Sequence, residues 1–191
     1  TRHSSDLKEF QSFRGNYTYH KLIKTKKGKR DTILITPPKI NTVLTKEKLF
    51  KNQIGKKIAD FKVEDIYGNE FDSSQLKGKV VVLNFWFIAC PPCIHEIPDL
   101  NKTVEKYKNN KDIVFIAFAL DSEKKIGSFL SKTEFDYTIV PNAKNITKDF
   151  KVPAWPSHMV IDRKGIIQYT SVGLEKESIQ ELTKQINKEL K

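Results

Sequence analysis

A Cys-Pro-Pro-Cys segment at residues 90–93 limits the possible folds of this chain more than any other feature. It directly follows the longest apolar run of the sequence, residues 80–89, which is typical of a buried β-strand. The apolar residues after Cys93 recur with helical spacing. The two prolines suit the first turn of a helix, because the N–H groups that they lack would be unpaired there. The sequence therefore predicts a strand that leads into a helix, with Cys90 at the helix N-terminus.

These two cysteines are the only ones in 191 residues, and their spacing allows a reversible disulfide ring. A helix N-terminus favours the thiolate of Cys90 over the thiol. We therefore interpret the pair as a redox site. A zinc site is disfavoured, since it needs about four ligands and the chain offers one cysteine pair with His95 and His158. A structural disulfide is disfavoured because so short a loop removes little chain entropy. Two inert, buried cysteines are the remaining alternative.

Length and charge limit the function classes. A chain of 191 residues that is 38% hydrophobic can form one ordinary domain with its own core. The net charge is +11, but residues 1–57 contain 15 Lys and Arg against 4 Asp and Glu, whereas residues 58–191 contain 19 of each. A nucleic-acid-binding fold would carry its basic surface on the main domain. We therefore favour a solvated basic extension, and attraction to an anionic membrane or partner is the alternative.

No apolar run of the sequence approaches the length that spans a bilayer. The chain begins with Thr1 rather than Met. We expect that an N-terminal segment was removed, such as a signal peptide or a lipid-anchored segment.

Turn signals and periodicity predict two parts, a basic extension at residues 1–53 and a main domain at residues 54–191. In the extension, the first fifteen residues show no period, two strands are expected at 16–24 and 31–36 around a turn at 26–29, and a short helix is expected at 45–52. In the main domain, strands are predicted at 61–64, 70–71, 79–88, 112–120, 137–140, 158–162 and 166–171, and helices at 91–108, 123–131, 147–150 and 175–190. A βαβ unit followed by a hairpin and a closing helix predicts an α/β fold with a mixed sheet.

Three motifs, in this order, resemble those of the thioredoxin superfamily. They are Val-Leu-Asn-Phe-Trp at 82–86, Cys-Pro-Pro-Cys at 90–93, and Pro-Ser-His-Met-Val-Ile-Asp at 156–162. The nearest resemblance is to the TlpA/ResA-like branch of extracytoplasmic thiol–disulfide oxidoreductases. The lead-in at 54–61 also resembles the opening segment of that branch and of the peroxiredoxins. The resemblance covers residues 54–191 and implies a thioredoxin-like fold, with a central mixed β-sheet flanked by helices, after an N-terminal β-hairpin.

The redox chemistry follows from the two sulfurs. We expect Cys90, the more exposed cysteine, to attack a partner disulfide and Cys93 to resolve the mixed disulfide. No metal or cofactor is needed for this exchange. The first N–H groups able to reach the Cys90 sulfur are those of Cys93 and Ile94. No cation lies between the cysteines, so we predict a mild couple, nearer about −270 mV than about −120 mV.

The resemblance also implies residues that bind the substrate. Trp86 resembles the tryptophan that packs beside the disulfide in the family, although it also reads as a core aromatic on a buried strand. Trp155 and Pro156 match the loop opposite the disulfide, where the family has a cis-proline that turns the preceding backbone toward the partner chain. Trp155 would then border the partner groove as an aromatic anchor.

Glu96 is the predicted acid–base residue. Thioredoxin has a buried aspartate where this chain has Asn84, which cannot act as a base. The TlpA/ResA-like branch instead tends to place a glutamate three residues after the second cysteine, and Glu96 fits. That spacing puts it on the same helix face as Cys93, whose proton it could take and return. The alternative is a solvent-facing glutamate. We expect His95 at the surface and His158 on a strand beside the cis-proline loop, without a role.

The sequence thus predicts a thiol–disulfide oxidoreductase that reduces protein disulfides in the periplasm or another extracytoplasmic space, and that is recharged by an upstream thiol partner. Anchoring through the removed segment, or membrane-surface association through the basic extension, would fit that location. One alternative is a peroxiredoxin-type peroxidase, which needs a Thr shortly before its cysteine, where residues 85–90 read Phe-Trp-Phe-Ile-Ala-Cys. The other is a redox-inactive binding module with a thioredoxin-like fold.

Overall fold

The structure is a computed structural model that describes residues 18–24, 31–36, 40–173 and 177–191, with side chains from residue 45 onward. The chain divides into two compact units, Thr1–Thr45 and Lys46–Lys191. None of the helices in these described ranges has the length and apolar character needed to cross a membrane.

The first unit contains a β-hairpin of strands β1 (Thr18–Lys24) and β2 (Asp31–Thr36). The strands pair antiparallel, as expected from the sequence. The predicted turn at 26–29 and the first fifteen residues lie outside the described residues. Helix α2 (Ile40–Lys51) begins five residues before its predicted start. Its first turn contains three β-branched residues, which have low helix propensity, so the sequence pattern did not indicate it.

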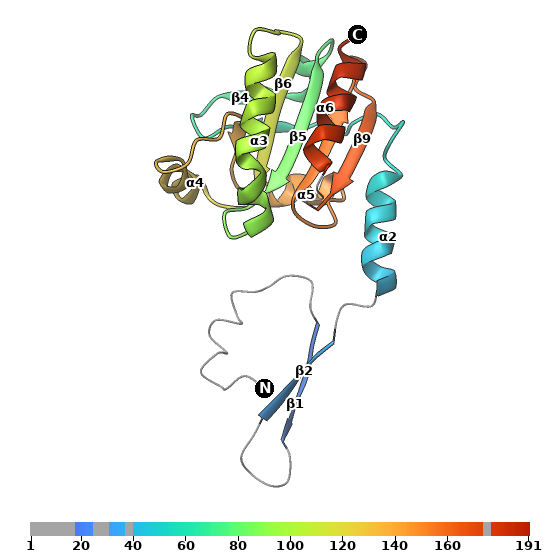
Figure 1. Cartoon of the computed structure of the whole chain (residues 1–191), viewed down its shortest axis with the longest axis vertical. Helices are drawn as coiled ribbons and strands as arrows, with labels where there is room; N and C mark the ends of the chain where they lie inside the picture. The colour runs from blue at the N-terminus through green and yellow to red at the C-terminus, as the bar shows by residue number, and fades with distance from the viewer. Residues whose placement is uncertain (1–17, 25–30, 37–39, 174–176) are drawn as a thin grey trace. The chain divides into compact units, whose positions relative to one another are not determined.

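A five-stranded mixed sheet forms the centre of the second unit, in the order β7-β6-β5-β8-β9 (Figure 1). The strands of this sheet are β5 (Val80–Trp86), β6 (Ile113–Ala119), β7 (Thr138–Val140), β8 (Ser157–Ile161) and β9 (Ile167–Val172). Strands β5, β6 and β7 are parallel, and β8 and β9 run antiparallel to their neighbours. A separate antiparallel pair is formed by β3 (Lys62–Glu64) and β4 (Glu70–Asp72).

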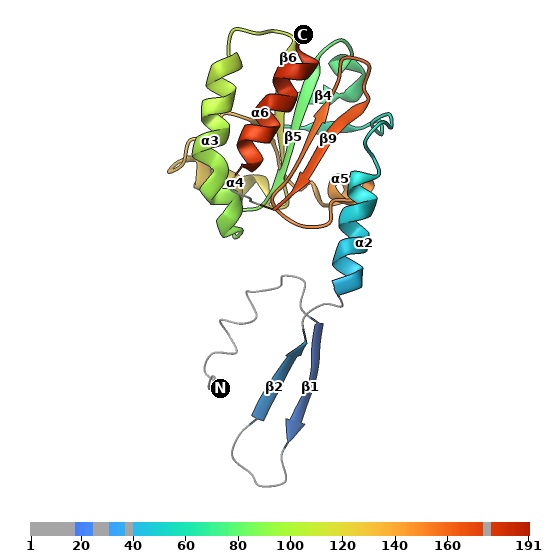
Figure 2. The ribbon, with the colours of Figure 1, turned by 45° about the vertical axis from the view of Figure 1, so that its right-hand side comes forward.

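Helices cover the sheet. They are η2 (Ser73–Leu76), α3 (Pro91–Tyr107), α4 (Glu123–Leu130), α5 (Lys144–Asp149) and α6 (Ser178–Glu189). Helices α3 and α6 lie side by side on one face in both views (Figures 1 and 2), and α5 lies on the other face. The predicted fold class, a mixed sheet flanked by helices, is confirmed.

Strand β5 explains why the core has two layers. All seven of its residues are buried, and successive side chains point to opposite faces of the sheet. Val80, Val82 and Trp86 join the layer under α3 and α6, whereas Leu83 and Phe85 join the other layer. A strand buried on both faces reads as one continuous apolar run. Asn84 is the exception in that run, and it lies in the layer under α3.

The layer away from α3 and α6 is rich in phenylalanine. The rings of Phe61, Phe85, Phe118 and Phe150 contact one another with centroid separations of 5.5 to 6.2 Å. Phe50, from the last turn of α2, is 1% exposed and belongs to the same cluster. The sequence analysis assigned Phe50 to the extension. The boundary at residue 53 remains a prediction, but the main core includes this earlier residue.

Candidate active site

Cys90 and Cys93 form a disulfide at the N-terminus of α3. Cys90 is the N-cap residue, with φ −106° and ψ 96°, and Pro91 is the first residue of the helix. The Cys93 N–H donates to the Cys90 Sγ at 3.3 Å. This geometry follows from the sequence, because the chain leaves β5, turns through three residues and enters a helix that proline can start. The predicted placement of Cys90 is confirmed.

Only one of the two expected N–H groups reaches the Cys90 sulfur. The Ile94 N–H instead donates to the carbonyl oxygen of Cys90 at 3.1 Å, as the first turn of a helix requires. Both sulfur-bearing side chains are largely buried, with Cys90 4% and Cys93 1% exposed. Cys90 is therefore the more accessible of the two.

The loop between β5 and α3 is held by Asp121, which sequence analysis missed. The Ile88 N–H donates to Asp121 Oδ2 at 2.7 Å, and the Cys90 N–H donates to the Phe87 carbonyl at 3.2 Å. Asp121 lies just beyond the carboxyl end of β6, next to the carboxyl end of β5. A polar residue just after a buried parallel strand could have indicated this position, because functional loops gather at the carboxyl ends of such strands.

The loop before β8 contains a cis peptide bond between Trp155 and Pro156, as predicted. Trp155 is half-buried, and its ring packs edge-to-face on Phe87 with centroids 5.7 Å apart and an interplanar angle of 87°. Both rings pack against the core layer that contains Cys90 and Cys93. The loop before β8 and the loop before Cys90 thus contact each other through two partly exposed aromatic rings.

Trp86 lies in the same core cluster as the two cysteines, as expected for a buried aromatic residue of this strand, and its part in substrate binding stays a prediction. Its side chain is 1% exposed and packs against Phe129 and Phe135, with ring centroids 5.5 and 5.3 Å away. As the last residue of β5, it points into the layer under α3 rather than to the surface. Trp86 supports the core beside the cysteines, and in this state it offers no surface to a partner.

A polar cluster of Asn84, Glu96 and His158 lies in the same core layer. Asn84 Nδ2 donates to Glu96 Oε1 at 3.0 Å and lies 3.4 Å from His158 Nδ1. His158 Nε2 lies 3.2 Å from Glu96 Oε2. Each of the three side chains is at most 1% exposed. Glu96 is therefore buried, not solvent-facing. His158 lies on β8 beside the cis-proline loop, as expected, and its side chain contacts Glu96.

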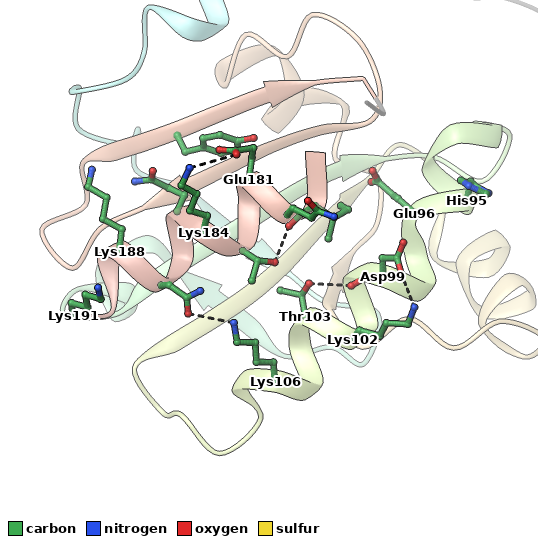
Figure 3. Close-up of a pocket in the computed structure, with 16 residues that line it drawn as sticks. His95, Glu96, Asp99, Lys102, Thr103, Lys106, Glu181, Lys184, Lys188 and Lys191 are labelled. Atoms are coloured by element: carbon green, nitrogen blue, oxygen red, sulfur yellow. Dashed lines mark hydrogen bonds and ion pairs between the residues drawn. The ribbon is translucent and has the colours of Figure 1, made fainter. Parts of the chain in front are cut away.

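The buried hydroxyl group of Tyr137 interacts electrostatically with Glu96. Burial raises the pKa of Tyr137 well above its ordinary value, and the charge of Glu96 raises it further. Glu96 is one of the residues that line a groove between α3 and α6 (Figure 3). Glu96 and His95 project from different sides of α3 in this view, and His95 is exposed, as predicted.

Metal binding finds no support in the described part of the chain. There, no three His, Cys, Asp or Glu side chains lie close enough together to hold a metal ion. The chemistry available at this site is that of the two sulfurs and the buried carboxylate behind them.

Comparison with known proteins gives the same fold. A provisionally assigned thiol:disulfide interchange protein DsbE from Chlorobium tepidum has a TM-score of 0.67 and 28% identity, over 72% of this chain and 98% of that one. The thioredoxin domain of a thiol-disulfide oxidoreductase from Bacteroides vulgatus, at 22% identity, shares the fold with a TM-score of 0.61, over 70% and 98% of the two chains. The fold is thioredoxin-like, and with its Cys-x-x-Cys disulfide the chain is a thioredoxin-like thiol–disulfide oxidoreductase.

Sequence relatives give the family. Residues 54–170 match the model of the AhpC/TSA family, and the chain belongs to that family. Thioredoxin-like protein YneN of Bacillus subtilis is 33% identical over 123 residues, which cover 63% of this chain and 72% of YneN. Thiol-disulfide oxidoreductase ResA of Bacillus thuringiensis is 32% identical over 145 residues, which cover 74% of this chain and 82% of ResA. The predicted superfamily and ResA-like resemblance are confirmed.

Proposed function

We propose that this protein reduces disulfides of other proteins outside the cytoplasm, with Cys90 as the attacking sulfur and Cys93 as the resolving sulfur. The observation that carries the proposal is the disulfide at the N-terminus of α3, where Cys90 is the more exposed sulfur and accepts the Cys93 N–H. An N–H donor and a helix N-terminus both stabilise a thiolate.

The exchange takes two steps. The Cys90 thiolate attacks one sulfur of the partner disulfide, and the other partner sulfur leaves as a thiolate. Cys93 then gives its proton to Glu96 and attacks Cys90 Sγ, so that the Cys90–Cys93 bond forms and the mixed disulfide breaks. Two electrons pass from the cysteine pair to the partner. A dithiol from an upstream redox partner returns the pair to its reduced form.

The direction of electron flow is argued from the thiolate environment. The strongest oxidants of this type are those whose reduced form is strongly stabilised. Here Pro91 and Pro92 supply neither a charge nor an N–H group, and the only donor to the Cys90 sulfur among the described residues is the Cys93 N–H. Weak stabilisation of the thiolate favours a reducing couple.

Partner binding is assigned to the aromatic surface beside the disulfide. Trp155 and Phe87 are partly exposed and contact each other, and Pro156 follows Trp155 in the same loop. Aromatic side chains are the usual anchors of protein interfaces. The location outside the cytoplasm rests on the resemblance to the TlpA/ResA-like branch. The excess of basic residues in the first 57 residues would favour an anionic membrane surface.

Insulin-disulfide reduction tests the proposal. The wild-type protein should accelerate reduction by dithiothreitol, Cys90→Ala should abolish the acceleration, and Cys93→Ser should accumulate a mixed disulfide through Cys90. Ser128→Ala, on the exposed face of α4, serves as the matched control and should behave as wild type. Activity in Cys90→Ala, or adducts that form only through Cys93, would overturn the assigned roles. Inactivity of the wild type would favour the binding-module alternative.

A further inference from the structure

The Asn84–Glu96–His158 cluster brings together polar groups from three elements. Asn84 and His158 are register partners on the neighbouring antiparallel strands β5 and β8, so their side chains share one face of the sheet. Glu96 reaches this face from α3, one helical turn after Cys93. A buried carboxylate is costly unless hydrogen bonds satisfy it. The two neighbouring side chains supply those bonds.

The hydrogen-bond pattern determines where the ring proton of His158 resides. The amide nitrogen of Asn84 can only donate, and it lies against both Glu96 Oε1 and His158 Nδ1. Nδ1 must therefore accept, which leaves the proton of a neutral ring on Nε2. From there it is donated to Glu96 Oε2. In this arrangement the Glu96 carboxyl group accepts one hydrogen bond from Asn84 and one from His158.

Among the described residues, the group that lies within ion-pair distance of the Glu96 carboxylate is His158. Titratable groups come from each packed element. Cys93, Tyr137 and His158 lie in the same core layer or contact the cluster, and the groove beside it is lined by His95, Asp99, Lys102 and Lys106 on α3, Tyr169 on β9, Glu181, Lys184 and Lys188 on α6, and Lys191 after it. Lys184 already lies 3.7 Å from the carboxylate of Glu181. The hydrogen bonds from His158 and Asn84 are thus the stabilising contacts that the structure gives to the Glu96 carboxylate.

We propose that His158 is a positioning residue for the resolving step, because its Nε2–H holds the Glu96 carboxylate ionised and oriented to take the proton of Cys93. This inference rests on the proposed function, in which Cys93 must lose a proton before it attacks Cys90. The proton passes from the Cys93 sulfur to Glu96, the Cys93 thiolate displaces the partner sulfur from Cys90, and Glu96 later releases the proton. The groove between α3 and α6, which reaches Glu96, gives that proton a route to solvent (Figure 3).

A small aryl disulfide, dithionitrobenzoate, separates the two steps in one stopped-flow experiment. Attack by Cys90 on the reagent releases a first coloured thiolate, and attack by Cys93 on the mixed disulfide releases a second. Cys93→Ser should release only the first, which assigns the phases. The critical pair of variants is His158→Gln and His158→Asn. The Gln amide nitrogen reaches the position of Nε2, whereas the Asn amide reaches only that of Nδ1.

We expect His158→Gln to retain the rate of the second phase. His158→Asn should slow the second phase about tenfold or more at neutral pH and raise the pH midpoint of that phase by about one unit, because this variant loses a hydrogen bond to the charged Glu96 carboxylate. The first phase should be unchanged in both variants, which also shows that the site is folded. Met159→Val, on the same strand but in the other core layer, controls for general disturbance of β8 and should leave both phases unchanged.

The outcomes separate this inference from the proposed function. Equal second phases and equal pH midpoints in the Gln and Asn variants would overturn the role of His158. Loss of the first phase in wild type, or release of both thiolates by Cys93→Ser, would instead overturn the assigned roles of the cysteines. An equal slowing by Met159→Val would reduce His158 to a structural residue.

Discussion

Glu96→Gln is the substitution that most directly tests the chemistry of the buried cluster. The change removes the charge and the base but keeps the size of the side chain. A Gln Oε1 can still accept the bond from Asn84 Nδ2, which measures 3.0 Å in the native protein. The new amide group meets His158 Nε2, 3.2 Å from the native oxygen, and both now carry protons. One buried hydrogen bond is lost, so we expect a stability loss of about 1–3 kcal/mol.

The kinetic effect should be larger and confined to one step. Loss of a positioned general base typically costs about a hundredfold or more in rate. The second thiolate release from dithionitrobenzoate should therefore slow by about that factor near neutral pH, and the first release should change little. At alkaline pH the difference should shrink, because solvent base then removes the Cys93 proton. The absence of the negative charge also favours the Cys93 thiolate in the variant.

Stopped-flow traces over a range of pH, for wild type and Glu96→Gln, measure both phases. Superimposable profiles of the second phase would refute the reasoning and leave solvent as the proton acceptor. Equal slowing of both phases would show that the substitution disturbs the N-terminus of α3 rather than the proton transfer. Urea unfolding of the two proteins gives the stability difference independently.

Four further predictions concern the redox couple, the N-terminal segment, Phe50 and Asp162. The midpoint potential of the Cys90–Cys93 pair should lie roughly between −200 and −290 mV in a glutathione titration, and a value above about −150 mV would contradict the mild couple. Deletion of residues 1–45 should retain insulin reduction but weaken sedimentation with anionic vesicles. Phe50→Ala should lower the free energy of unfolding, measured with urea, by about 3–5 kcal/mol. Burial raises the pKa of Asp162, but hydrogen bonds from Ile166, Gln168 and Lys164 lower it by more, so the pKa lies below its ordinary value of 3.8. The charged carboxylate therefore stabilises the fold above that pH, and Asp162→Asn should be less stable than wild type at neutral pH. The difference in the free energy of unfolding should vanish as acid protonates the native carboxylate.

The sequence predicted the main domain well because its signals are local. The apolar run of β5, the prolines at the start of α3 and the turn residues between β8 and β9 each indicate one element without knowledge of the others. The disulfide followed from the spacing of the two cysteines, and the cis-proline followed from the resemblance. For Trp86 the sequence left both a core position and a place at the site open. A residue at the end of a buried strand can point either to the surface or into a layer, and only the packing of α4 and Phe135 determines which.

The role of His158 needed the sheet order, which the sequence does not state. Asn84 and His158 are 74 residues apart and become neighbours only because β8 pairs with β5. A physical signal was nevertheless present. Each is a polar residue at a buried position of a strand that is mostly apolar, and a buried polar group left unpaired costs about 1–3 kcal/mol. Two such groups in one domain therefore imply a shared partner, and the glutamate one turn beyond Cys93 was the candidate able to accept from both.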